Sequence, residues 1–212
     1  IKLKNFKYTK LKIKGKTYKI FEIHNGRVFT DRNDITAYIS EENYLTEGSL
    51  QFKKFDQINS KNQSIEKNAT LINGTIGFKK KINGNILSLL SGGASRNNFT
   101  HWFTDVIPRI VLFSKKFNLN IIDNFYVPSL KYNYQVESLK LLKIPIKKII
   151  SSEDTKHIEA KKIFYTSHPC HYYPTQAQKW SFESLRKIYI PVKLKKNKEY
   201  KKIFVDRDQL KL

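Results

Sequence analysis

The sequence predicts a mixed α/β protein in which a β-rich region precedes a parallel α/β layer. Lysine alternates with apolar residues over much of Lys2–Lys19, which is the period of strands with one solvated face. From Asn98 to Lys116 the apolar residues recur about every 3.6 positions, which indicates an amphipathic helix. Beyond that helix, strand-like and helix-like segments alternate along the chain, an order typical of parallel sheets.

Residues 1–91 form the predicted β-rich N-terminal region with hairpins. Asn25-Gly26 and Asn83-Gly84 each lie between two runs of strand-like composition. Asn-Gly favours a two-residue hairpin turn, because both positions of that turn need positive φ. Gln51–Thr75 is rich in Asn, Ser, Lys and Gln, so we expect mainly loop there.

Residues 92–192 form the predicted α/β layer. Pro174 is placed to occupy the first turn of its last helix, where a missing N–H is tolerated. Pro108 lies inside its first helix and cannot bond the carbonyl of Thr104, so it predicts a kink. The expected elements are a helix at 98–116, a strand at Phe125–Val127, a helix at Asn133–Leu142, strands at Ile149-Ile150 and Lys162–Tyr165, and a helix through Trp180 and Ile188.

Residues 193–212 are interpreted as a linker and the first strand of a missing second domain. Lys193–Lys202 is hydrophilic and dense in lysine, and Ile203-Phe204-Val205 has the composition of a strand. We therefore expect this sequence to be part of a longer reading frame. Its start at Ile1 and its lack of methionine favour the same interpretation.

The charge is strongly positive, with 40 Lys and Arg against 18 Asp and Glu and a formal net charge of +22. Only six of the basic residues are arginine. Phosphate and base recognition more often use the bidentate fork of arginine, so we expect a solvated lysine surface and no nucleic-acid partner. Such a surface would suit anionic lipid or acidic polysaccharide, and peripheral membrane association is therefore an expectation.

Hydropathy and cysteine content limit the class of protein further. No apolar run approaches the roughly 20 residues that a spanning helix needs, and the Lys-rich start lacks a signal-peptide core. Cys170 is the single cysteine, which excludes an internal disulfide and a cluster of several thiolates. We expect a cytoplasmic location, with the inner face of the membrane as the place of any lipid contact.

The densest group of polar side chains lies between Gly92 and Arg109. Gly92-Gly93 permits a tight turn after a strand, and Asn97 or Asn98 can cap the helix that follows. The backbone N–H groups of such a helix start suit an anionic or hydroxyl-rich ligand.

His101, Asp105 and Arg109 recur four residues apart and should share one stripe of that helix. In a functional interpretation, His101 accepts a proton from a hydroxyl while Asp105 fixes its tautomer, or Asp105 is itself the base. In a structural interpretation, this stripe is the polar edge of a core helix with an Asp105–Arg109 ion pair. Spacing alone leaves both open.

The segment that contains Gly92-Gly93, Asn98–Trp102 and Asp105–Arg109 resembles the hallmark of glycosyltransferase family 61. This family includes bacterial capsular polysaccharide biosynthesis proteins. The resemblance covers roughly Leu87 to Leu212. It extends to a strand and helix ending in Leu141-Leu142-Lys143-Ile144, with lysine where glycine is usual, and to a strand ending in Val205-Asp206-Arg207, with aspartate where serine is more common.

The resemblance implies the N-terminal half of a GT-B glycosyltransferase, with a Rossmann-like parallel layer and residues 92–192 as the acceptor-side domain. It implies inverting transfer of a hexose or pentose from a nucleotide sugar to a glycan acceptor in surface or capsular polysaccharide biosynthesis. It implies no cofactor beyond the nucleotide-sugar substrate and no bound metal.

The resemblance also assigns site residues. Asp105 and His101 are the catalytic candidates, and which of them is the base stays open. Arg207 would neutralise the departing diphosphate. The predicted substrate contacts are Asn97, Asn98, Trp102 and Arg109.

His168-Pro169-Cys170-His171 gathers donors that zinc accepts. No second pair at suitable spacing accompanies them, so we interpret the segment as a loop near the acceptor cleft, without a metal. The alternatives to an enzyme are a noncatalytic basic module that binds nucleic acid or anionic polysaccharide, and an inactive truncated remnant. Binding of nucleic acid should weaken steeply with salt, whereas recognition of a sugar should not.

Overall fold

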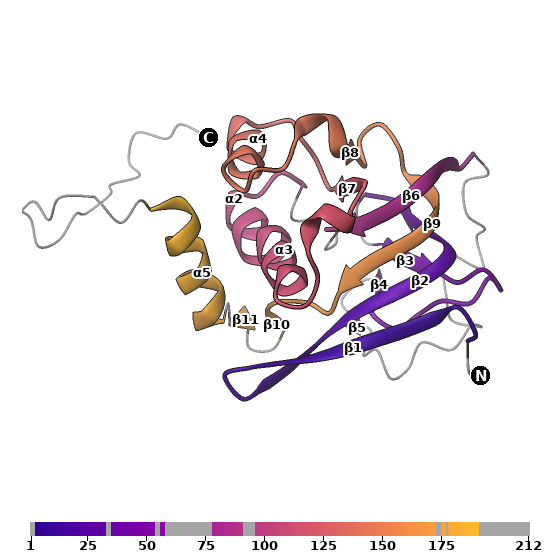
Figure 1. Ribbon diagram of the computed structural model, residues 1–212, viewed down its shortest axis with the longest axis horizontal. Helices are drawn as coiled ribbons and strands as arrows, with labels where there is room; N and C mark the ends of the chain where they lie inside the picture. The colour runs from indigo at the N-terminus through magenta and orange to yellow at the C-terminus, as the bar shows by residue number, and fades with distance from the viewer. Residues whose placement is uncertain are drawn as a thin grey trace, which may run out of the picture.

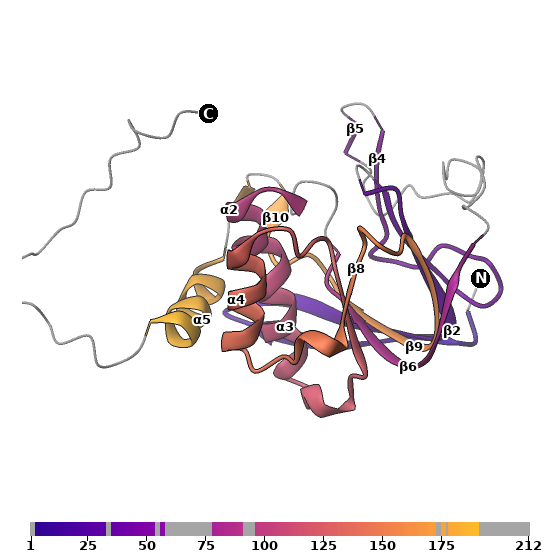
Figure 2. The ribbon, with the colours of Figure 1, turned by 90° about the horizontal axis from the view of Figure 1, so that it is seen from above.

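The structure is a computed structural model that describes residues 3–32, 35–53, 56–57, 78–90, 96–172, 175–176 and 178–190. In this part of the chain, nine strands form one mixed sheet and helices cover one of its faces (Figures 1 and 2). The strand order is β5-β4-β3-β2-β9-β6-β7-β8, with β1 paired to β2 beside this path. The mixed α/β class expected from the sequence is confirmed.

The strands of the sheet are β1 (Phe6–Ile13), β2 (Lys16–Thr30), β3 (Ile35–Ile39), β4 (Leu50–Lys53), β5 (Asp56–Gln57), β6 (Lys80–Ser88), β7 (Asn124–Val127), β8 (Ile149–Ser151) and β9 (His157–Thr166). A separate pair is formed by β10 (His171–Tyr172) and β11 (Thr175–Gln176). The helical elements are α2 (Phe99–His101), the π-helical turn η4 (Trp102–Val106), α3 (Ile107–Ser114), η5 (Leu119–Ile121), α4 (Asn133–Leu141), η6 (Ile146–Lys148) and α5 (Lys179–Tyr189).

Parallel pairing dominates the second half of the sheet. β6 is parallel to β7 and to β9, and β7 is parallel to β8. From β6 the chain moves outward to β7 and β8 and then returns to β9 on the other side of β6, so the strand order reverses between β6 and β9. The predicted division at residue 91 falls within this one sheet and not between two sheets.

Both predicted Asn-Gly hairpin turns are wrong. β2 continues through Asn25-Gly26 while its ladder with β9 stays in register. Asn83-Gly84 lies inside β6, where the pairing with β9 shifts by one residue and forms a bulge. Because both strands have neighbours on two sides, the unusual backbone at these sites, such as the φ of 49° at Asn25, distorts the strand without reversing it.

The hairpin of the N-terminal region turns at Lys14-Gly15 instead. These residues have φ of 47° and 80°, and they connect Ile13 of β1 to its partner Lys16 of β2. Positive φ at both central positions is the property of the two-residue turns that match strand twist. The lysine alternation therefore predicted the strands correctly but not the position of the turn.

Most elements expected in residues 92–192 are present, including the strands β7, β8 and β9 and the helix α4. The last helix begins at Lys179 and not at Pro174, so the predicted helix start is wrong. Much of the expected loop at 51–75, the turn at Gly92-Gly93 and all of residues 193–212 lie outside the described residues. The Rossmann-like GT-B arrangement stays a prediction.

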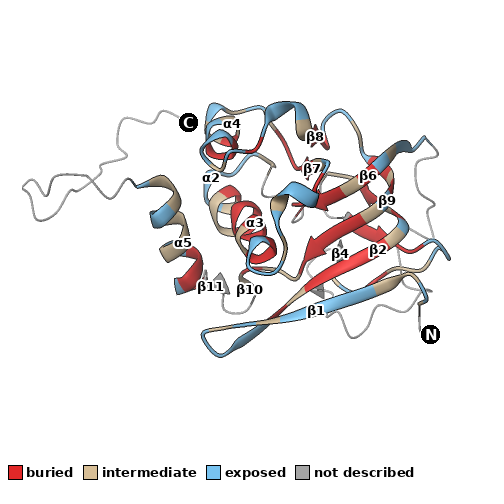
Figure 3. Ribbon diagram, viewed as in Figure 1, coloured by how far each residue is buried: buried red, intermediate tan, exposed pale blue. Residues whose placement is uncertain are grey.

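Each face of the sheet has its own hydrophobic core, because neighbouring residues of a strand point to opposite sides. Phe164 of β9 packs on the helix side with Trp102 and Phe113, whereas Tyr165 packs on the opposite side. There Tyr165 stacks on Tyr38, with ring centroids 3.7 Å apart. Figure 3 shows buried residues along β2 and β9 and a mostly exposed β1.

In the described part of the chain, no helix has both the length and the apolar character needed to cross a membrane.

The path of β2 can be tested with two glycine substitutions. A Cβ at Gly26 would lie 2.9 Å from the carbonyl oxygen of Ile39 and would also overlap Ile23, so Gly26→Ala should lower the free energy of unfolding by about 3 kcal/mol. At Gly15 a Cβ would meet open space, and only the positive φ disfavours a side chain there. Gly15→Ala should therefore lower the free energy of unfolding by about 1 kcal/mol. Urea denaturation measures both, and an equal or smaller loss for Gly26→Ala would contradict a continuous β2.

Candidate functional site

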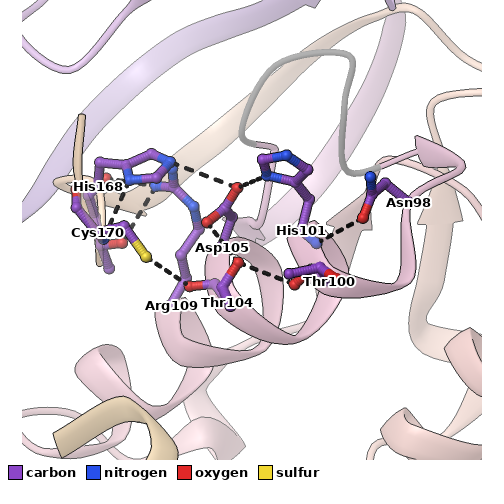
Figure 4. Close-up of polar contacts among 9 residues, drawn as sticks. Asn98, Thr100, His101, Thr104, Asp105, Arg109, His168 and Cys170 are labelled. Atoms are coloured by element: carbon purple, nitrogen blue, oxygen red, sulfur yellow. Dashed lines mark hydrogen bonds and ion pairs between the residues drawn. The ribbon is translucent and has the colours of Figure 1, made fainter. Parts of the chain in front are cut away.

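The candidate site lies at the carboxyl ends of two neighbouring central strands. The helix that starts with α2 follows β6, and the loop containing His168 and Cys170 follows β9. Since the strand order reverses between these strands, this edge is the place where open α/β sheets usually bind ligands. Figure 4 shows the polar side chains that meet there.

The helix begins with a capping contact. The side-chain oxygen of Asn98 accepts a hydrogen bond from the backbone N–H of His101 at 3.2 Å. Asn97 and Asn98 are both exposed, so their amides lie at the surface beside the start of the helix. Asn98 therefore has a clear structural role, and Asn97 is accessible to a ligand.

A π-helical turn accommodates the proline that was expected to kink the helix. In η4 the backbone N–H of Ile107 bonds the carbonyl of Trp102 five residues earlier. Pro108 follows and has no N–H for the carbonyl of Thr104. That carbonyl instead accepts a hydrogen bond from the thiol of Cys170, with Sγ at 3.4 Å (Figure 4). The loop after β9 is thus joined to the helix at the position where proline frees an acceptor.

His101 and Asp105 form a close pair, as the spacing suggested. The Nδ1 of His101 lies 2.6 Å from Oδ2 of Asp105, and the hydroxyl of Thr104 lies 3.0 Å from Oδ1. The side chain of His101 is 44% exposed and that of Asp105 only 8%. A carboxylate can only accept, so Nδ1 donates its proton, and in neutral His101 the lone pair is then on Nε2.

Arg109 is buried beneath this pair and does not face solvent. It is 2% exposed, and its Nη1 donates to the carbonyl of Thr166 at 2.7 Å. Among the described residues no ion pair joins Asp105 to Arg109, so the structural interpretation of that pair is wrong. The guanidinium links the helix to the end of β9 and supplies positive charge inside the site.

His168 and Cys170 also belong to this cluster. Nε2 of His168 lies 4.0 Å from Oδ2 of Asp105. Burial lowers the pKa of His168 to about 4, with a further decrease from Arg109, although Asp105 opposes it. Burial raises the pKa of the Cys170 thiol to about 12, and the nearby Asp105 acts in the same direction. The thiol is therefore protonated at neutral pH and is not an activated nucleophile.

Two predicted site residues remain, Trp102 and Arg207. Trp102 is fully buried, and its Nε1 donates to the hydroxyl of Ser138 at 2.9 Å. It holds the helix against α4 and does not face a substrate. Arg207 lies outside the described residues, so its contact with a phosphate stays a prediction.

The sequence placed the segment of His168 and Cys170 near the cleft, but it did not predict their contact with Asp105. The sequence feature that pointed to this segment was its concentration of donor side chains. The contact with Asp105 could not be predicted, because it requires that β9 end beside the helix that follows β6. One oxygen of Asp105, one nitrogen of His168 and the sulfur of Cys170 now lie within 4.8 Å of one another, a set of atoms that could hold a metal ion.

Comparison of the chain with protein-family models, with curated proteins and with solved structures finds no match. The resemblance to glycosyltransferase family 61 therefore stays an expectation from the sequence. The exposed imidazole of His101, supported by the buried carboxylate of Asp105, is suited to take a proton from a ligand.

The burial of His168 should appear in the pH dependence of stability. Its pKa is about 4 in the folded chain and near 6.5 in the unfolded chain, so between these values the unfolded chain binds a proton that the folded chain does not. Stability that is present above about pH 6.5 is therefore lost as the pH falls toward 4, by up to about 3 kcal/mol from this residue. Urea denaturation at several pH values measures this loss.

His168→Gln should remove that part of the pH dependence, because it removes the titrating group. His24→Gln, at a half-exposed histidine on β2, is the control and should keep it. Equal acid sensitivity in His168→Gln and the unchanged chain would contradict the burial of His168.

Proposed function

We propose that this chain is the acceptor-side part of an inverting glycosyltransferase in which His101 takes the proton from an acceptor hydroxyl. The observation that carries the proposal is the 2.6 Å contact between His101 and Asp105, combined with an exposed imidazole and a buried carboxylate. The hydroxyl oxygen then attacks the anomeric carbon of a nucleotide sugar as the bond to the diphosphate breaks.

The exposure of the two side chains favours His101 over Asp105 as the base. Both carboxylate oxygens of Asp105 have hydrogen-bonding neighbours, one in His101 and one in Thr104. Asp105 fixes the tautomer of the imidazole and stabilises the imidazolium that forms when Nε2 takes the proton. It acts through His101 and is a positioning residue in this proposal.

Surrounding groups support binding of a glycan. Asn97 and Asn98 place exposed amides, which can donate to and accept from sugar hydroxyls, at the start of the helix. Arg109 is committed to Thr166 and would contribute charge, not a direct contact. Arg207 remains the proposed partner of the departing diphosphate.

A basic surface on β1 supports the proposed contact with anionic lipid at the inner face of the membrane. Lys10 and Lys12 are exposed on this strand. Charge of this kind attracts anionic headgroups within a Debye length. The proposed setting is the synthesis of a surface or capsular polysaccharide.

His101→Gln tests the proposed base. It should lower the rate of transfer by about 10²- to 10⁴-fold and leave the melting temperature nearly unchanged, since the side chain is half-exposed. The measurement, made on the full-length enzyme that contains this chain, is release of nucleoside diphosphate from a panel of nucleotide sugars with glycan acceptors. His24→Gln is a matched control, because His24 also contacts a carboxylate, that of Glu22, and is similarly exposed. Full activity in His101→Gln would remove His101 as the base.

Asp105→Asn distinguishes the two roles. It should lower transfer less than His101→Gln does, because the imidazole that takes the proton remains. Loss of transfer in Asp105→Asn with activity retained in His101→Gln would make Asp105 the base. Absence of transfer with every donor, together with nucleic-acid binding that falls steeply with salt, would favour the noncatalytic basic module.

A further inference from the structure

We propose that Asp105, His168 and Cys170 form a binding site for a zinc ion. Their donor atoms, one oxygen, one nitrogen and one sulfur, lie within 4.8 Å of one another. They come from two elements, the π-helical turn η4 and the loop after β9, which converge in Figure 4. Zinc is the divalent ion that accepts imidazole, thiolate and carboxylate together.

The orientation of His168 suits a metal ligand. Its Nδ1 accepts a hydrogen bond from the backbone N–H of Cys170 at 3.1 Å in one tautomer, and it lies 2.9 Å from the carbonyl oxygen of Cys170, to which it donates in the other. When Nδ1 carries the proton it donates to that carbonyl, and the lone pair of Nε2 then faces Oδ2 of Asp105 at 4.0 Å. A histidine whose second nitrogen donates to a backbone carbonyl is the usual arrangement around bound zinc.

The carboxylate of Asp105 is also held for this role. His101 donates to Oδ2, so the group is oriented before any ion arrives. The hydroxyl of Thr104 lies 3.0 Å from Oδ1 and shares its one proton between that oxygen and the carbonyl of Thr100 at 2.9 Å. Hydrogen bonds of this kind orient ligating carboxylates. With the proton of His168 on Nδ1, Nε2 and Oδ2 both present lone pairs toward the space between them, where a bound cation would stabilise this tautomer.

Cys170 supplies the third ligand as a thiolate. When zinc binds, the proton of the thiol leaves to solvent and the Sγ–Zn bond replaces the hydrogen bond to Thr104. The negative charges of the Asp105 carboxylate and the Cys170 thiolate then neutralise the two positive charges of the zinc ion. Arg109 adds one positive charge nearby and opposes binding, so loss of either negative ligand should weaken zinc binding strongly.

Only a small movement is needed to close the site. Bonds of about 2.0 to 2.3 Å in a tetrahedron separate the donor atoms by about 3.3 to 3.8 Å, so the present spacing must shrink by about 1 Å. His168 and Cys170 follow the last residue of β9 and lie in a loop, where side-chain rotation can supply this movement. Three protein ligands leave the fourth position open for water or a ligand hydroxyl, as in catalytic zinc sites.

This inference departs from the expectation of a site without metal, and it does not depend on the glycosyltransferase proposal. Zinc binding can be measured without any assay of transfer. Failure of transfer and failure of zinc binding are therefore separate results.

The test is titration of the chelator-treated protein with Zn²⁺ and, separately, with Co²⁺. We expect one Zn²⁺ per chain at this site and at least tenfold weaker binding in Cys170→Ser and in His168→Gln. His24→Gln is the matched histidine control and should bind as the unchanged chain does. Circular dichroism of each variant shows whether it folds.

The Co²⁺ experiment does not require a variant. Because Cys170 is the only cysteine of the sequence, a thiolate-to-cobalt charge-transfer band can arise only from this residue. Absence of that band in the unchanged protein at saturating Co²⁺ would overturn the proposal, even if the variants fail to fold. Zinc binding of unchanged strength in folded Cys170→Ser and His168→Gln would overturn it as well.

Discussion

The pairing of β9 with both β2 and β6 is the constraint on which the rest of the structure depends. β9 is antiparallel to β2 and parallel to β6, so it joins the β-rich N-terminal region to the parallel half of the sheet. Its alternating side chains, such as Phe164 and Tyr165, enter the cores on opposite faces. The carbonyl of its last residue, Thr166, receives Arg109, and the loop that follows carries His168 and Cys170 to the helix.

A second feature gives the site its shape, and it follows from the chemistry of proline. Pro108 leaves the carbonyl of Thr104 without its helical donor, and the chain responds with a π-helical turn and a thiol from a distant segment. That turn contains Asp105, which the altered geometry places between His101 and His168. Titratable side chains from the helix and from the loop after β9 therefore lie together at the π-helical turn.

The periodic patterns in the sequence were sufficient to predict which segments form strands or helices, and to predict one contact of the candidate site. Alternating lysines predicted the strands near the N-terminus, and the four-residue spacing of His101 and Asp105 predicted their contact. The Asn-Gly pairs misled because their backbone freedom serves a distorted strand as well as a turn, and only the neighbouring strands decide between the two. The apolar periodicity of the helix already indicated a buried Trp102, whereas the resemblance placed it at the substrate. Sequence could not show that Cys170 reaches Thr104, since that contact depends on the packing of distant elements.

The central place of β9 also has a consequence for biogenesis. β9 lies between β2 and β6 in the sheet, but both of these strands are translated before it. Each of them therefore has one unpaired edge until β9 has left the ribosome. Parallel and long-range pairings of this kind form slowly, because a long stretch of chain must be ordered before they stabilise anything. The nascent chain therefore exposes two open β edges at an intermediate length. At that stage it should depend on chaperones more than the finished fold does.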